Sequence, residues 1–131
     1  MIDTLALVFG IIYLGVGVTG FALAPNGGLL LGIFEVSTFH HVFHIGIGAL
    51  GIVAGGKKIG RVYCRLIGGV LLFLGAIGFL VPMLVGALFA FPTANLLTDN
   101  MLHLVTGTIL GYFGLIAPPA PIQADKQTLS R

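Results

Sequence analysis

Four apolar stretches of about 20 residues constrain the fold of this 131-residue chain more than any other feature. They run from about Thr4 to Ala24, Phe39 to Gly55, Val62 to Val81 and Asp99 to Ala117. A helix that spans a membrane needs about this number of mostly apolar residues. Turn signals or prolines follow the stretches, and the last is followed by Pro118-Pro119. The sequence therefore predicts an all-α integral membrane protein that folds as a four-helix bundle.

The composition excludes several other classes of protein. Hydrophobic residues make up 57% of the chain and charged residues only 8%, whereas a soluble domain carries about 25% charged residues. Six basic against four acidic residues form no basic footprint, so no nucleic-acid partner is expected. The lone Cys64 has no partner for an internal disulfide and is expected to be a buried, inert thiol.

The basic residues predict the orientation of the spans. They lie between the second and third spans and in the C-terminal tail, at Lys57, Lys58, Arg61, Arg65, Lys126 and Arg131. With four spans, this connection and both termini fall on one side, which the positive-inside rule assigns to the cytoplasm. The tail over residues 121–131 is then cytoplasmic, and Glu35 and Asp99 fall on the outer side. Two short apolar segments on that side, Gly28–Val36 and Met83–Phe91, are expected to lie in the membrane interface over the helix ends.

The chain resembles one two-helix unit written twice. Three glycines in the first span recur in the third with a shift of 58, namely Gly10, Gly17 and Gly20 as Gly68, Gly75 and Gly78. His44 recurs as His103 with a shift of 59, and His40 is replaced there by Asp99. We therefore predict a single domain over residues 1–120 with repeat units at about 1–57 and 58–118. The two helical hairpins would be related by a pseudo-twofold axis along the membrane normal.

Polar pairs open the second and fourth spans, as His40-x-x-x-His44 and Asp99-x-x-x-His103. Residues four apart lie on one helical face, one turn apart. Both spans start on the outer side, so the pairs are expected at similar depth, and the duplication predicts that their faces meet. Three imidazoles and a carboxylate form a ligand set suited to zinc, iron, manganese or copper.

Glycines continue the same two helical faces, at Gly48, Gly51, Gly55, Gly107, Gly111 and Gly114. Small residues let membrane helices approach closely, so the polar pairs are expected on packing faces rather than toward lipid. Ionisable groups at membrane depth usually face the interior of a bundle and have a partner there.

Three interpretations of this cluster stay open. A metal ion would be held by His40, His44, Asp99 and His103. Alternatively, His44 and His103 would be axial ligands to haem, or one of them would hold a chlorophyll magnesium, with the glycines leaving room for a flat ring. Without a metal, Asp99 would be the N-cap of the fourth span, and His40 would hydrogen-bond to Glu35 or Asp99.

Four polar neighbours are expected to play lesser roles. His41 points about 100° away from His40 on a helix, so it is expected at the membrane interface. Glu35 is expected to be a solvated loop residue. Asn95 and Asn100 are expected to serve as turn and capping groups.

Two segments carry a resemblance to a known family. One runs from Leu31 to His44 and contains the HxxxH opening, and the other runs from Asn95 to His103 and contains the D-N-x-L-H opening. Together they resemble an uncharacterised family of small four-span bacterial membrane proteins, catalogued as a domain of unknown function. The resemblance covers nearly the whole chain and points to His40, His44, Asp99 and His103. It implies a fold but no activity.

Three hypotheses for function follow from these features. The first is a small membrane protein that binds a metal ion or a metal-containing cofactor in an outward-facing His/Asp cluster. The second is an accessory subunit of a larger respiratory or photosynthetic membrane complex, in contact with other membrane subunits or with copies of itself as well as with lipid. The third is an enzyme that uses metal-bound water. Because the sequence has no phosphate loop, nucleophile elbow, CxxC or HExxH motif, a non-catalytic protein is favoured.

Overall fold

The computed structural model describes residues 1–91 and 96–116 of the chain. Asn95, Ala117, the Pro118-Pro119 stop and the tail over 121–131 lie outside the described residues. In chain order the elements are α1 (Ile2–Leu23), β1 (Gly28–Leu30), β2 (Phe34–Val36), α2 (Thr38–Gly56), α3 (Gly60–Leu80), α4 (Pro82–Phe89), α5 (Leu97–Gly111) and the π-helix η1 (Tyr112–Ile116).

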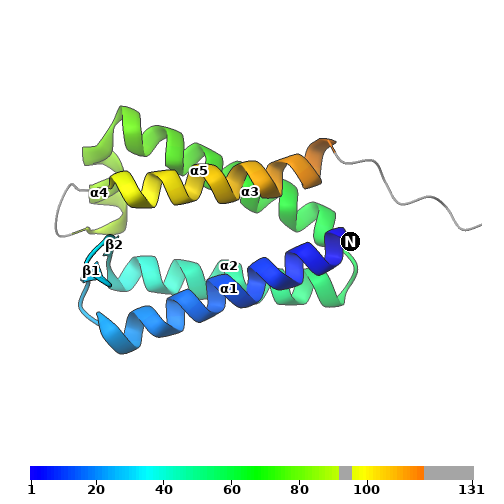
Figure 1. The fold of residues 1–131 in the computed structure, drawn as a ribbon, viewed down its shortest axis with the longest axis horizontal. Coiled ribbons are helices and arrows are strands. Elements are labelled where there is room, and N and C mark those ends of the chain that lie inside the picture. The colour runs from blue at the N-terminus through cyan, green and yellow to red at the C-terminus, as the bar shows by residue number, and fades with distance from the viewer. Residues whose placement is uncertain (92–95, 117–131) are drawn as a thin grey trace, which may run out of the picture.

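The long helices form two pairs (Figure 1). Helix α1 packs chiefly on α2, and α3 packs chiefly on α5, which η1 extends. The N-terminus and the α2–α3 connection lie at one end of the molecule, whereas the β1–β2 hairpin and α4 lie at the other. The chain is thus mostly helical, as predicted.

Within residues 1–91 and 96–116, three helices are long and apolar enough to cross a membrane, and these are α1, α2 and α3. Their ends fall within about two residues of the boundaries predicted from the apolar stretches. Less than half of the most apolar window of each helix is buried inside the protein. A bilayer is the environment that accepts so much exposed apolar surface.

Helix α5 is shorter than the predicted fourth span. It ends at Gly111 after 15 residues, a length of about 22 Å at 1.5 Å per residue. Together with η1 the helical segment continues to Ile116. The regular α-helix thus stops at Tyr112, and α5 by itself is shorter than the other three long helices.

Glycines allow the backbones within each pair to approach closely. A Cβ atom on Gly10 would lie 2.5–2.8 Å from backbone atoms of Gly48, Gly51 and Ile52, and one on Gly68 would lie 2.5–3.0 Å from backbone atoms of Leu110 and Gly111. Real Cβ contacts are never this short, so both positions require glycine.

The same correspondence continues along both pairs. Gly17 lies against the carbonyl of His41, and Gly75 lies against the carbonyl of Asn100. These contacts of Gly68 and Gly75 in α3–α5 thus repeat those of Gly10 and Gly17 in α1–α2, with the shifts of 58 and 59 that the sequence shows.

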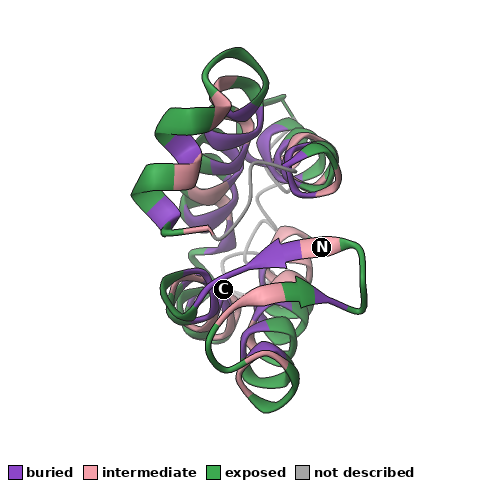
Figure 2. Cartoon of the chain, turned by 90° about the vertical axis from the view of Figure 1, so that its left-hand side faces the viewer, coloured by how far each residue is buried: buried purple, intermediate pink, exposed green. Residues whose placement is uncertain are grey.

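One part of the all-α prediction is wrong, because the segment over residues 28–36 forms a small antiparallel hairpin. Leu29 pairs with Glu35, and Leu30 pairs with Phe34. The turn uses left-handed backbone at Leu31 and at Gly32, which has a φ of 75°, a conformation that glycine adopts without strain. Figure 2 shows the hairpin lying across the end of the helices, with β2 buried.

Local hydrogen bonds fix where the site-bearing helix begins. Ser37 is the N-cap of α2, and its hydroxyl accepts a hydrogen bond from the backbone N–H of His40. The same hydroxyl donates to the carbonyl of Phe89 at the end of α4. The start of α2 is therefore tied to α4, which covers it.

Candidate functional site

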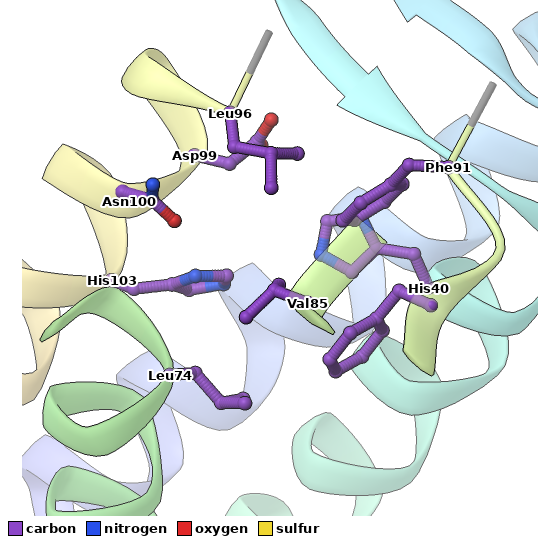
Figure 3. Close-up of a pocket in the computed structure, with 9 residues that line it drawn as sticks. His40, Leu74, Val85, Phe91, Leu96, Asp99, Asn100 and His103 are labelled. Carbon is purple, nitrogen blue, oxygen red and sulfur yellow. The ribbon is translucent and has the colours of Figure 1, made fainter. Parts of the chain in front are cut away.

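Three buried imidazoles converge where α2 meets α5. His40 and His44 lie one turn apart on α2, with ring centroids 4.2 Å apart. The ring of His103, on α5, has its centroid 6.0 Å from that of His40 and 6.4 Å from that of His44. Figure 3 shows His103 and His40 extending toward each other from opposite sides of the pocket. The structure thus brings together all three histidines that the repeated motif singles out.

The nitrogen atoms of this cluster lie close enough together that they could hold a metal ion. One ring nitrogen from each of His40, His44 and His103 lies within 4.8 Å of the others, and all three residues are buried. Within the described part of the chain, neither ring nitrogen of His40 nor of His44 has a hydrogen-bond partner. Buried polar atoms are nearly always hydrogen-bonded in folded proteins, so four such nitrogens in one cluster are unusual.

Asp99 lies beside the imidazoles, but it does not belong to the group of three residues whose ligand atoms lie within 4.8 Å of one another. It is buried on α5, one turn before His103, and its Oδ2 accepts a hydrogen bond of 2.9 Å from the backbone N–H of Glu35. The predicted capping role is wrong, because the N-cap of α5 is Leu96. Asp99 instead connects the hairpin to α5.

Apolar side chains close the pocket between α2 and α5. His40 contacts the rings of Phe89 and Phe91 edge-on, with centroids 5.7 Å and 5.1 Å away. Leu74, Val85 and Leu96 complete the lining, together with Asp99, Asn100 and His103. The enclosed volume is about 10 Å³, which is room for one water molecule or a single ion.

Two of the neighbouring polar residues are not placed as expected. His41 is 1% exposed, and its Nε2 lies 2.8 Å from the carbonyl oxygen of Ala24. Its ring occupies the space left by Gly20 on α1. Glu35 is fully buried rather than solvated, because the hairpin folds back over the helix ends.

Asn100 is the counterpart of His41 in the second pair. It is buried, and its side-chain amide lies against Gly78 as His41 lies against Gly20. Both residues therefore pack within their own helix pair, one residue away from the face that carries the imidazole cluster.

A family model described as a domain of unknown function, DUF4383, matches residues 3–116. The chain belongs to this family. The resemblance to an uncharacterised family is thereby confirmed. No curated protein and no solved structure matches the chain. For this DUF4383 member, function must be inferred from the side chains of the site.

Sequence reasoning missed Tyr13, which adjoins the cluster from α1. Its ring centroid lies 5.3 Å from that of His44. Its hydroxyl donates a 2.9 Å hydrogen bond to Thr106 on α5, so Tyr13 links the two helix pairs beside the site. The available signal was spacing, because Tyr13 lies on the helical face of α1 that carries Gly10, Gly17 and Gly20.

Proposed function

We propose that this protein is an integral membrane protein that binds a first-row transition-metal ion through His40, His44 and His103. The observation that carries the proposal is the convergence of three buried imidazoles, two of which have no hydrogen-bond partner at either ring nitrogen within the described residues. Leaving such an atom unsatisfied costs about 1–3 kcal/mol. A bound ion satisfies one nitrogen of each ring and turns an unfavourable cluster into a favourable one.

The dimensions of the cluster support an ion. Two nitrogen ligands of a tetrahedral zinc ion are about 3.3 Å apart, given zinc–nitrogen distances of about 2.0–2.1 Å. The nitrogens here lie within 4.8 Å of one another, so small side-chain rotations would close the site. Imidazole ligands favour zinc, copper and iron, whereas manganese prefers oxygen ligands.

A porphyrin-type ring fits this arrangement poorly. The proposed axial ligands, His44 and His103, have ring centroids 6.4 Å apart, and His40 lies 4.2 Å from one and 6.0 Å from the other. A planar macrocycle several times wider than an imidazole would have to pass between them and displace His40. The position of His40 therefore supports a small ion over a haem held between His44 and His103.

Asp99 contributes charge and orientation in this proposal. Its carboxylate lines the same pocket as His40 and His103, and a negative charge there favours a bound cation. Its hydrogen bond with the Glu35 backbone keeps the hairpin over the site. Groups around a metal site hold its ligands in place in this way.

We further propose four spans, with α5 and η1 as the fourth, and two hairpins related by a pseudo-twofold axis along the membrane normal. The matched glycine contacts in the two helix pairs support the repeat. The end that carries Lys57 and Lys58 would be cytoplasmic. The histidine cluster, at the hairpin end (Figure 1), would then lie near the outer surface.

The proposal is tested by measuring the metal content of protein purified from membranes without added chelator. We expect about one metal ion per chain in the wild type and none in a His44→Gln or His103→Gln variant. The matched control is His41→Gln. His41 is a buried histidine that follows His40 in the sequence, but its ring contacts Ala24 instead of the cluster. A wild-type protein that binds no cobalt, zinc or copper stoichiometrically refutes the proposal, and so does equal metal content in all four proteins.

A further inference from the structure

A second, larger cavity borders the imidazole cluster on the side facing α1. Its volume is about 290 Å³, close to the lower end of the range for small-molecule sites, about 300–1,000 Å³. Helix α1, the hairpin, α2 and α5 all contribute to its walls, through Gly15, Val16, Thr19, Leu30, Leu31, Phe34, Val36, His40, His44, Asp99 and Leu102. We call this cavity the lateral cleft.

The lateral cleft is polar at one place and apolar elsewhere. His40, His44 and Asp99 form its polar wall, and all three are buried. Its remaining walls are apolar apart from the hydroxyl of Thr19. Val16, Leu31 and Leu102 are among the exposed large hydrophobic residues of the protein, so the rim of the cleft suits lipid rather than water. A molecule that enters from the bilayer would need an apolar body and one polar group.

The charges around the cleft restrict that polar group. Among the residues that the structure describes, no lysine or arginine lines the cleft, and Asp99 is the only acidic residue in its wall. An anionic head group would be attracted by the proposed metal ion but repelled by this carboxylate, and a cationic one would be attracted by the carboxylate but repelled by the metal ion. A hydroxyl group interacts favourably with both, because its hydrogen can be donated to the carboxylate while its oxygen lone pair is offered to the metal.

We propose that the lateral cleft binds a membrane-dissolved alcohol or phenol and holds its hydroxyl beside the metal ion. This inference rests on the proposed metal site, because the cation is what disfavours an amine and attracts the hydroxyl oxygen. Three protein nitrogens leave a tetrahedral metal with one open position, which the hydroxyl oxygen fills. The apolar body of the ligand then lies against α1 and the hairpin.

Gly15 provides a sharp test of the cleft. It lines the cleft, and a Cβ atom placed on it would meet no other atom within 4 Å. A Gly15→Leu substitution therefore adds a bulky side chain at the wall of the cleft, at a position where its Cβ atom contacts no neighbouring atom. Gly69 on α3 is the matched control, because its Cβ would also meet nothing within 4 Å and it does not line the cleft.

The experiment uses full-length protein in lipid nanodiscs, loaded with cobalt(II) as a spectroscopic substitute for zinc. The probe is an alkylphenol that carries a diazirine on its chain, and the control probe is its methyl ether, which donates no hydrogen bond. Labelled residues are located by mass spectrometry of peptides, and the cobalt absorption bands report on metal ligation. We expect saturable labelling near Val16 and Leu102, at least tenfold weaker affinity for the ether, and a change in the cobalt bands on addition of the phenol.

The variants separate the possible outcomes. We expect Gly15→Leu to weaken phenol labelling at least tenfold while the cobalt bands persist, and Gly69→Leu to behave as the wild type. Equal labelling of the two glycine variants refutes the cleft, and equal affinity for phenol and ether shows a groove for acyl chains only, which refutes the hydroxyl assignment. A wild type without cobalt bands refutes the metal site itself. Intact cobalt bands that the phenol leaves unchanged refute the ligand assignment alone.

Discussion

Replacing His44 with leucine should have opposite effects on the protein with and without metal. Both ring nitrogens of His44 are buried and have no hydrogen-bond partner in the described part of the chain. Each such atom costs about 1–3 kcal/mol, so leucine, which is of similar size, relieves a penalty of about 2–6 kcal/mol. The ring contacts that His44 makes with Tyr13 and His40 are lost, at about 0.5–1.5 kcal/mol each.

The central values, about 4 kcal/mol relieved and about 2 kcal/mol lost, predict that His44→Leu stabilises the metal-free protein by about 2 kcal/mol. In contrast, metal at a free concentration 100-fold above its dissociation constant should add about 2.7 kcal/mol to the wild type and nothing to the variant. Because the chain has no tryptophan, unfolding is followed by far-UV circular dichroism in mixed micelles titrated with SDS. Each protein is measured with chelator and with zinc.

The control is His41→Leu, which removes a buried histidine whose Nε2 is hydrogen-bonded to Ala24. Loss of that bond should destabilise the protein by about 0.5–1.5 kcal/mol with or without zinc, and the stabilisation by zinc should remain. If His44→Leu destabilises the metal-free protein as much as His41→Leu does, the reasoning from unsatisfied nitrogens is wrong. Stabilisation by zinc that survives in His44→Leu would refute the ligand role of His44.

Three further predictions follow from the same structure. Gly10→Ala places a Cβ atom 2.5–2.8 Å from the backbone of α2 and should destabilise the protein by about 1–3 kcal/mol in the same unfolding assay. The control is Gly69→Ala, whose Cβ atom would meet open space and which should be neutral or stabilising by up to about 1 kcal/mol. Tyr13→Phe removes a hydrogen bond to α5 and should cost about 0.5–1.5 kcal/mol. Tyr63→Phe removes a buried hydroxyl that has no hydrogen-bond partner among the described residues, so it should cost nothing. A larger cost for Tyr63→Phe than for Tyr13→Phe would contradict both assignments. Purification in mild detergent, followed by mass measurement of the native particle, tests the accessory-subunit hypothesis, and we expect a metal-bearing particle that contains this chain alone.

The sequence predicted the three apolar helices and the meeting of the histidines because both depend on local periodicity. A run of about 20 apolar residues determines a span almost regardless of its neighbours, and a spacing of four residues determines which side chains share a helical face. His40 and His44 therefore had to lie together on α2. The glycines predicted that the histidine-bearing faces pack against other helices, since small residues mark the faces on which helices approach closely.

The sequence did not predict what depends on a second packing partner. His41 was expected at the interface because it points away from His40, but α2 packs on α1 with that face, and Gly20 leaves space for the ring. Glu35 was expected in solvent because a loop usually lies on the surface, but the hairpin brings its backbone to Asp99 on α5. Each helix in a bundle can bury two faces, and a single periodicity reveals only one of them.

A comparison of equivalent positions in the two helix pairs distinguishes the polar residues that serve packing from those that form the site. His41 and Asn100 each lie against a glycine of the adjacent helix in their own pair, so their polarity serves packing that one pair completes alone. His44 and His103 are also equivalent in the sequence, but their rings face each other across the two pairs. Under the proposed repeat, one unit supplies His40 and His44 and the other supplies His103 and Asp99. Neither unit alone supplies all three imidazoles of the cluster, so a metal ion bound by His40, His44 and His103 would stabilise the association of the two helix pairs.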